Sequence, residues 1–128
     1  MARVMGIGGV FFKAKDPDTL RAWYNEHLGM DLEPWGGCVF RWRELEIPDR
    51  DGATVWSVFP DSTTYFAPSQ ASFMINYRVE DLESALADLR QAGCAVEDRT
   101  EESALGKFGW VTDPEGNKVE LWEPPRTS

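Results

Sequence analysis

The stretch Asp113-Pro114-Glu115-Gly116-Asn117-Lys118-Val119-Glu120-Leu121-Trp122-Glu123-Pro124 decides the fold of this chain. Pro114 presets φ for a turn, and Gly116 or Asn117 can take the positive φ that closes it. Val119 and Leu121 then alternate with Lys118, Glu120 and Trp122, which is the period of a strand with two different faces. The stretch therefore predicts a tight turn followed by a strand.

The same pattern occurs earlier, in Asp51-Gly52-Ala53-Thr54-Val55-Trp56-Ser57-Val58-Phe59-Pro60. Glycine, valine and proline recur in register at an offset of 64 positions, and Gly29 and Gly93 have the same separation. Asp16 and Asp81 are 65 positions apart. Self-similarity at one spacing is a fold-level signal, and it predicts that the chain consists of two copies of one unit.

Local signals predict the elements of each copy. Aspartate caps a helix that glycine ends, at Asp16 to Gly29 and again at Asp81 to Gly93. Residues 61–70, which contain Pro68, are expected to be a connector, and residues 99–106 a loop. The expected strands are residues 3–14, 30–35, 38–45 and 53–59 in the first copy, and 72–79, 94–97, 108–112 and 118–122 in the second.

This order predicts an α+β fold with two tandem βαβββ modules, residues 4–60 and 72–124, in one domain of 128 residues. A unit of about 60 residues buries little apolar surface alone. We therefore expect the modules to pair through their strands into one cupped mixed sheet, with both helices outside.

Composition excludes several classes of function. A net charge of −9 argues against nucleic acid as a partner. No apolar run approaches the roughly 20 residues of a membrane span, and no signal-peptide core follows Met1, so we expect a cytoplasmic protein without membrane contact. Cys38 and Cys94 form no C-x-x-C motif and are expected to be reduced thiols.

These motifs resemble the vicinal oxygen chelate superfamily, which includes glyoxalase I, extradiol dioxygenases, methylmalonyl-CoA epimerase and the fosfomycin and bleomycin resistance proteins. The resemblance spans the chain and is carried by residues 7–17, 23–29, 75–82 and 113–121. It implies two βαβββ modules that cup a pocket between them, and many members form dimers. We therefore expect a homodimer.

The resemblance also implies a site for a divalent metal. In the enzymes of this superfamily, histidine or glutamate side chains on the first and fourth strands of each module hold the metal, which acts as a Lewis acid. The corresponding positions here are Gly9, Trp56, Met74 and Glu120, and only glutamate suits such a metal. Zinc and iron sites generally need three protein ligands. The sequence thus predicts no metal and no cofactor, with Glu120 as the only catalytic candidate. His27, the one histidine, is expected near its helix end rather than in the site.

Side chains on the same face as these positions should line the cup. An aromatic cup with a few polar groups is typical of a small-molecule site. Two alternatives remain open, a pocket or a core filled by Trp56 and Met74. Glu120 likewise is either a general base or the partner of Lys13 or Arg78 in a salt bridge. The residues expected to bind the ligand are Phe11, Lys13, Trp56, Met74, Asn76, Arg78, Glu120 and Trp122.

The function predicted first is metal-free binding of a small organic molecule, which would stack on Trp56 and Trp122. The alternative is a lyase, isomerase or dioxygenase-type enzyme with a degenerate metal site, or with Glu120 as its acid–base catalyst. Whether the protein is an enzyme is left open by the sequence, as is a purely structural role. The expected partners are a small organic ligand and a second copy of the chain.

Overall fold

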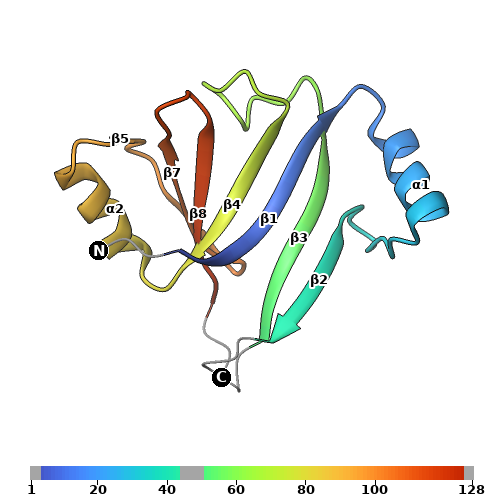
Figure 1. Ribbon diagram of the computed structural model, residues 1–128, viewed down its shortest axis with the longest axis horizontal. Helices are drawn as coiled ribbons and strands as arrows, with labels where there is room; N and C mark the ends of the chain where they lie inside the picture. The colour runs from blue at the N-terminus through green and yellow to red at the C-terminus, as the bar shows by residue number, and fades with distance from the viewer. Residues whose placement is uncertain (1–3, 44–50, 126–128) are drawn as a thin grey trace.

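The computed structural model describes residues 4–43 and 51–125, in which two helices flank a mixed β-sheet (Figure 1). Residue 3 and residues 44 and 45, which the sequence assigns to strands, lie outside the described residues. The sequence also predicts a polar loop at residues 48–52; residues 48–50 lie outside the described residues, whereas Asp51 and Gly52 begin a strand. The elements are β1 (Val4–Ala14), α1 (Pro17–Leu28), β2 (Cys38–Arg43), β3 (Asp51–Pro60), β4 (Phe73–Val79), α2 (Leu82–Gln91), β5 (Ala95–Val96), β6 (Glu101–Ser103), β7 (Gly106–Thr112) and β8 (Lys118–Glu123).

The sheet has the strand order β2-β3-β1-β4-β8-β7-β5, with β6 paired to β7. β1 and β4 are antiparallel and join the first half of the chain to the second. The pairs β1–β3 and β4–β8 are parallel, whereas the remaining pairs are antiparallel. The predicted α+β class, with an open mixed sheet and two helices, is confirmed.

Both helices begin at the predicted aspartates. The side chain of Asp16 accepts the backbone N–H of Thr19 at 3.1 Å, and that of Asp81 accepts the backbone N–H of Ser84 at the same distance. Gly29 ends α1 in the left-handed region at φ 66°. Within the described ranges, neither helix is long and apolar enough to cross a membrane.

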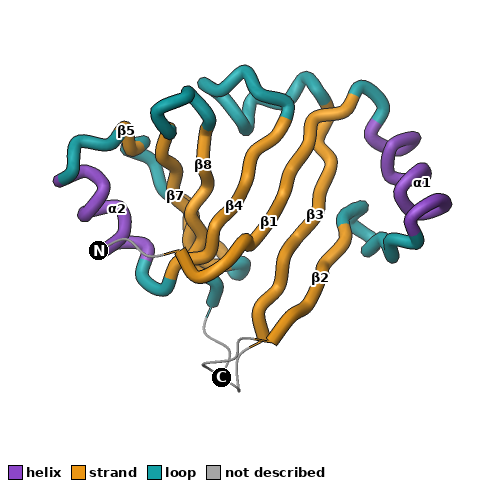
Figure 2. The backbone as a smooth tube through the Cα atoms, in the orientation of Figure 1, coloured by secondary structure: helices purple, strands orange, loops and turns teal. Residues whose placement is uncertain are grey.

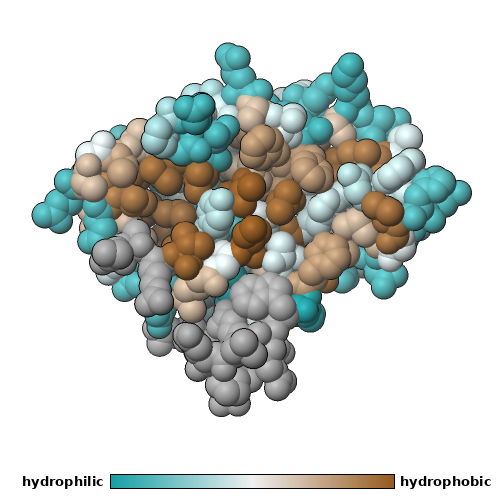
Figure 3. All heavy atoms as spheres, viewed as in Figure 1, coloured by the Kyte–Doolittle hydropathy of each residue, from teal (hydrophilic) through white to brown (hydrophobic). Residues whose placement is uncertain are grey.

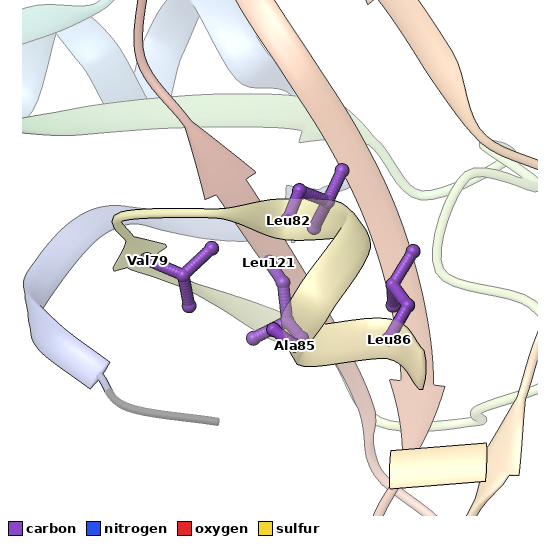
Figure 4. Packing of buried hydrophobic residues seen from close by; sticks show 5 residues of the cluster. All are labelled: Val79, Leu82, Ala85, Leu86 and Leu121. Atoms are coloured by element: carbon purple, nitrogen blue, oxygen red, sulfur yellow. The ribbon is translucent and has the colours of Figure 1, made fainter. Parts of the chain in front are cut away.

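Each helix packs on its own end of the sheet. Under α2, the buried cluster joins Leu82, Ala85 and Leu86 of the helix to Val79 and Leu121 of the strands (Figure 4). The helices lie at opposite ends of the sheet, and β1 and β4 run between them (Figures 1 and 2).

The cluster that faces α1 has a different composition. It contains Trp56, Cys38 and Val58, with Leu20 and Tyr24 of α1 packed against it. We call the sheet face that bears both helices the helix face, and the opposite one, which carries Met74, Asn76, Trp110 and Glu120, the cup face.

Two predicted segments are wrong in detail. Residues 30–35 form no strand, because the backbone groups of Glu33 and Gly36 bond locally in a turn, through Glu33 N–H to the Gly37 carbonyl at 2.7 Å and Gly36 N–H to the Glu33 carbonyl at 2.8 Å. The first half therefore reads β-α-β-β. Within the predicted loop 99–106, Glu101 pairs with Phe108, which makes β6 a short strand on β7.

Residues that are 64 positions apart in the sequence repeat do not occupy equivalent positions in the strands. Trp56 pairs with Val10 and packs toward α1, whereas Glu120 pairs with Asn76 on the cup face. Gly116 lies in a turn at φ 86°, but its counterpart Gly52 lies inside the β2–β3 ladder. A shift of one residue moves every side chain of a strand to the other face. The prediction that Trp56 and Glu120 occupy equivalent positions is therefore wrong.

Candidate functional site

A row of three paired residues forms the centre of the cup face. Glu120 of β8 is the register partner of Asn76 on β4 and of Trp110 on β7. Register partners on neighbouring strands project to the same side of a sheet. The strand pairing alone therefore brings one carboxylate, one amide and one indole together.

Glu120 is 1% exposed, and its carboxylate accepts three hydrogen bonds. Asn76 Nδ2 donates to Oε1 at 2.6 Å, Trp110 Nε1 donates to Oε2 at 2.9 Å, and the Tyr65 hydroxyl also donates to Oε2. None of these donors is Lys13 or Arg78, the two salt-bridge partners expected from the sequence. Uncharged donors thus surround the carboxylate, which a buried anion needs in order to remain in the folded core.

Tyr65 is the residue that the sequence interpretation missed. It belongs to the connector, residues 61–70, which runs between the ends of β3 and β4 (Figure 2) and was expected only to link the two halves. The neighbouring Phe66 is fully buried with Met74 and Trp110, and Phe11 packs against the same cluster. The connector therefore inserts two aromatic side chains into the cup. Pro68 and the lack of periodicity in this segment gave no signal of such an insertion.

Burial changes the pKa values of Glu120 and Tyr65. Burial raises the pKa of Glu120, although its hydrogen bonds to Tyr65, Asn76 and Trp110 and the charge of Lys118 act in the opposite direction. Burial also raises the pKa of Tyr65, as do the negative charge and the hydrogen bond of Glu120. Tyr65 therefore keeps its proton and acts as a donor toward the carboxylate.

Two cations lie over the Trp110 ring. The Arg99 guanidinium is 4.3 Å from the ring centroid, and the Lys118 ammonium is 5.1 Å from it. Lys118 is buried, donates to the Tyr65 carbonyl at 2.9 Å and forms an ion pair with Glu97 at 3.4 Å. Such contacts favour one orientation of an indole. Here they accompany the orientation in which Trp110 donates to the carboxylate.

The structure places most of the predicted ligand-binding residues on the cup face. Phe11, Met74, Asn76 and Glu120 lie at or around the central cluster. The Lys13 ammonium is 5.4 Å from the centroid of the Phe66 ring, which itself belongs to that cluster.

The remaining three predicted residues differ in position. Trp122 stacks on Phe108, with ring centroids 6.1 Å apart, and its indole N–H donates to the Leu105 carbonyl at 2.8 Å. Arg78 is buried on β4, two residues after Asn76, and therefore lies on the same face of the sheet. Trp56 does not join them, because it is 7% exposed in the α1 cluster on the helix face. Its predicted place in the cup is wrong.

The question of a pocket or a filled core has a mixed answer. Phe66, Met74 and Trp110 are each 0% exposed and fill the centre. Met74 therefore fills the core, as one alternative predicts, whereas the connector and β7 supply the other two filling residues in place of Trp56. At the margin of the cup, Phe11 and Trp122 are only half-buried. The margin therefore retains aromatic surface that a small molecule can contact.

The residues present do not fit the divalent metal that the superfamily uses. A Cβ atom on Gly9 would lie 2.9 Å from Phe11 Cζ, so the Phe11 ring occupies the space of a side chain at that position. Trp56 is on the other face, Met74 is a buried thioether, and three donors occupy the carboxylate of Glu120. In residues 4–43 and 51–125, no group of three or more His, Cys, Asp or Glu side chains is arranged to hold a metal ion.

Comparison with known proteins agrees with this fold. The glyoxalase-like domain family matches residues 9–122, and the chain belongs to that family. No curated protein sequence gives a significant match.

Similar solved structures share this fold. Methylmalonyl-CoA epimerase from Streptomyces coelicolor, in complex with 2-nitronate-propionyl-CoA, has a TM-score of 0.70 at 14% identity, covering 97% of this chain and all of the other (100%). The epimerase from Mycobacterium tuberculosis has a TM-score of 0.62 at 19% identity, covering 96% of this chain and 90% of the other. A glyoxalase/bleomycin resistance protein/dioxygenase superfamily member from Vibrio splendidus 12B01 has a TM-score of 0.59 at 13% identity, covering 96% and 99%.

The buried carboxylate predicts a specific pH dependence of stability. Because its pKa is raised above the ordinary 4.5, the folded protein binds this proton more tightly than the unfolded chain does. The resulting stabilisation is present below pH 4.5 and is lost as the pH rises through the raised pKa. The loss is roughly 1.4 kcal/mol for each pH unit that separates the folded pKa from the unfolded one. Glu120→Gln should remove this component, so denaturant unfolding between pH 4 and pH 8, a range of about four pH units, should give a different slope for the variant.

Glutamine suits this test because it keeps the shape of the side chain. Its oxygen can still accept from Tyr65 and Trp110, and Asn76 can turn its amide to present Oδ1, a buried atom that has no hydrogen-bond partner among residues 4–43 and 51–125. The matched control is Glu102→Gln, since Glu102 is exposed on β6. Equal pH slopes for the wild type and Glu120→Gln would show that Glu120 titrates normally.

Proposed function

We propose that this protein binds a small organic molecule in the cup without the superfamily metal. The observation that carries this proposal is the environment of Glu120, a buried carboxylate held by uncharged donors and surrounded by aromatic rings. Mostly apolar sites with a few placed polar groups are typical of small-molecule binding. A metal would need Glu120 to give up its donors and still find two further ligands.

The chemical class of the ligand follows from the side chains that line the cup and from the net charge of the protein. The half-buried rings of Phe11, Phe59, Phe108 and Trp122 favour an aromatic ligand, and each aromatic contact contributes about 0.5–1.5 kcal/mol beyond area burial. The net charge of −9 favours a neutral or cationic ligand in long-range attraction. The epimerase of the same fold holds a small organic ligand, 2-nitronate-propionyl-CoA, which supports small-molecule binding as the class of function.

An isomerase is the second candidate. It is favoured by one feature, the hydrogen-bonded pair of Tyr65 and Glu120, whose pKa values are both raised. A carboxylate with a raised pKa is a better proton acceptor for acid–base chemistry near neutral pH. Glu120 would act only after Tyr65 withdraws its hydroxyl, because Oε2 already accepts two hydrogen bonds.

A thermal-shift screen of neutral and cationic aromatic compounds and small carbonyl compounds tests the proposal. We expect stabilising compounds whose effect does not change when zinc or manganese is added or a chelator is present. Trp122→Ala should weaken binding by roughly tenfold, because an aromatic contact of about 1.5 kcal/mol is lost. The control is Trp23→Ala, since Trp23 is 49% exposed on α1 and lies away from the cup.

Two results would contradict the proposal. One is that no compound stabilises the protein. The other is that binding requires a divalent metal and disappears with the metal site in Glu120→Ala. Product formation that is lost in Glu120→Gln while binding persists would favour the isomerase instead.

We also propose a homodimer through the helix face. On this face, Val4, Ile7 and Phe73 of β1 and β4 are 52%, 43% and 42% exposed. Their register partners include Tyr77 and Phe12, which pack toward the two helix clusters. Hydrophobic residues gather in the middle of the face shown in Figure 3, where the central strands lie. A second copy would cover this surface.

Light scattering at micromolar concentration checks this assembly. We expect a mass twice that of the 14.5 kDa chain, and Ile7→Lys should shift it to the monomer because the lysine charge would be buried at the interface. Leu105→Lys, at a 69% exposed position after β6, serves as the control. A single 14.5 kDa species for the wild type would refute the dimer.

A further inference from the structure

The side chain of Tyr65 lies in a subsite built by other elements. Its ring stacks on Phe59 of β3, with centroids 5.7 Å apart and an interplanar angle of 9°, and meets Trp110 of β7 edge-on at 6.1 Å and 89°. The Lys118 ammonium is 5.6 Å from the ring centroid, and the hydroxyl donates to Glu120. Three strands of the sheet therefore enclose one aromatic ring and accept one hydrogen bond from it. We call this space the Tyr65 subsite.

The occupant of the subsite is attached to the sheet by few polar contacts. The hydroxyl of Tyr65 bonds to Glu120, and its carbonyl accepts from Lys118 at 2.9 Å. One further backbone hydrogen bond joins the connector to the sheet, from Asp61 N–H to the Ala14 carbonyl of β1 at 2.9 Å. The others are local, from Thr63 to Pro60, Ala67 to Thr64 and Ser69 to Phe66, at 3.0, 3.0 and 2.9 Å.

The two aromatic side chains of the connector differ in burial, so that Phe66 holds the connector in place while Tyr65 can leave the subsite. Phe66 is 0% exposed, whereas Tyr65 is only half-buried and follows the exposed Thr64. Rotation of Tyr65 out of the subsite breaks its contact with Glu120 while Phe66 keeps the connector in place. The connector therefore retains its attachment when the subsite empties.

An empty subsite imposes a chemical requirement on any replacement. Without Tyr65, Glu120 would keep its hydrogen bonds from Asn76 and Trp110 but would lose one donor to Oε2. A buried charged acceptor that loses a partner is costly. The replacement must therefore carry a hydrogen-bond donor on a planar ring. It must also be uncharged, because the carboxylate would repel an anion and the Lys118 ammonium, 5.6 Å from the ring centroid of Tyr65, would repel a cation.

We infer that the Tyr65 subsite is the ligand site and that it takes an uncharged aromatic molecule with a donor group, such as a phenol, in exchange for the side chain of Tyr65. This inference rests on the proposed function, since it names the class of ligand that the cup binds. The tyrosine of the connector is the internal competitor of that ligand. The affinity for the ligand then depends on how strongly the side chain of Tyr65 binds in the subsite, because the two compete for it.

Titration with p-cresol, the free analogue of the tyrosine side chain, tests the exchange. Tyr65→Phe leaves a ring in the subsite but removes its hydrogen bond, so the internal competitor is weaker. We expect p-cresol to bind Tyr65→Phe roughly tenfold more tightly than it binds the wild type, the change expected for a hydrogen bond to a charged group. Calorimetry or NMR line shifts measure both constants.

Toluene and Tyr24→Phe are the matched controls. Toluene has the ring of p-cresol without the hydroxyl, and it should bind Tyr65→Phe at least about tenfold more weakly than p-cresol does. Tyr24 contacts Trp56 on the helix face, so Tyr24→Phe should leave the p-cresol affinity unchanged. Tyr65→Ala, which vacates the subsite, should bind p-cresol most tightly of all.

The inference is overturned by equal p-cresol affinity in the wild type and Tyr65→Phe, by equal affinity for p-cresol and toluene, or by no p-cresol binding to Tyr65→Ala. In each of these cases, a ligand found by the wider screen would leave the proposed function standing. If p-cresol binds only to Tyr65→Ala and no compound binds the wild type, the subsite is a closed core and both proposals fall.

Discussion

Trp110→Ala is expected to lower the free energy of unfolding by about 3–5 kcal/mol, the range for removing a buried aromatic side chain. Trp110 is 0% exposed and lies at the centre of the cluster with Phe66 and Met74. The change leaves a cavity and also deprives Glu120 of the indole donor at 2.9 Å. Both effects act in the same direction, because the carboxylate remains buried with one partner fewer.

Denaturant unfolding of two further variants separates these effects. Trp110→Phe refills most of the volume but lacks the N–H group, so its loss should be intermediate, about 1–3 kcal/mol. Trp23→Ala, at a 49% exposed position on α1, should cost less than about 1 kcal/mol. A loss below about 1 kcal/mol for Trp110→Ala would mean that the aromatic centre of the cup is not the tightly packed core described here.

Trp56→Ala is expected to be similarly destabilising, by about 3–5 kcal/mol, while ligand binding in the cup stays unchanged. Trp56 is 7% exposed and lies between the sheet and α1, with ring centroids 4.9 Å from Tyr24 and 6.1 Å from Phe12. The cavity would open beneath α1 on the helix face. The sheet itself then separates it from the cup.

Comparison with Trp122→Ala distinguishes a residue that stabilises the core from a residue that binds the ligand. Trp122 is half-buried on the cup side and stacks on Phe108, so its removal should cost less stability than that of Trp56 but should weaken ligand binding. Both quantities are measured on each variant, by denaturant unfolding and by calorimetry. Weakened binding in Trp56→Ala, with little loss of stability, would place that residue in the site after all.

The environment of Glu120 explains how a carboxylate can be held at the centre of the cup by hydrogen bonds. A carboxylate retained at the centre of an apolar cup needs partners, because an unpaired buried charge is strongly destabilising. Here Tyr65, Asn76 and Trp110 provide three hydrogen bonds. The connector thus supplies one of these three contacts, through the hydroxyl of Tyr65.

Local patterns were sufficient to predict the order and type of most elements. Asp16 and Asp81 begin the two helices, and the turn before β8 forms as Pro114 and Gly116 indicate. Such signals depend on residues three or four positions apart, so they can be recognised without knowledge of the fold. The family resemblance, which the match over residues 9–122 confirms, rested on the same local motifs.

The composition of the site was partly predictable as well. Glu120, Asn76 and Met74 are at the cup centre as expected, because alternation along β4 and β8 assigns their faces correctly. That Gly9 and Met74 are unsuited to hold a metal stays a prediction, which the crowding at Gly9 and the burial of Met74 support. The partners of the carboxylate were misassigned, as was the face of the sheet on which Trp56 lies.

The face of Trp56 and the role of Tyr65 were decided by tertiary structure alone. Trp56 lies on the helix face because β3 pairs with β1 in a register that differs by one residue from the register implied by the sequence repeat. Side chains of a strand alternate between its two faces, so a shift of one residue moves each side chain to the other face. Tyr65 reaches Glu120 across 55 positions of the chain, from a connector with no periodic pattern. A contact of that kind depends on the path of the whole backbone, because no local propensity places a loop side chain against a distant strand.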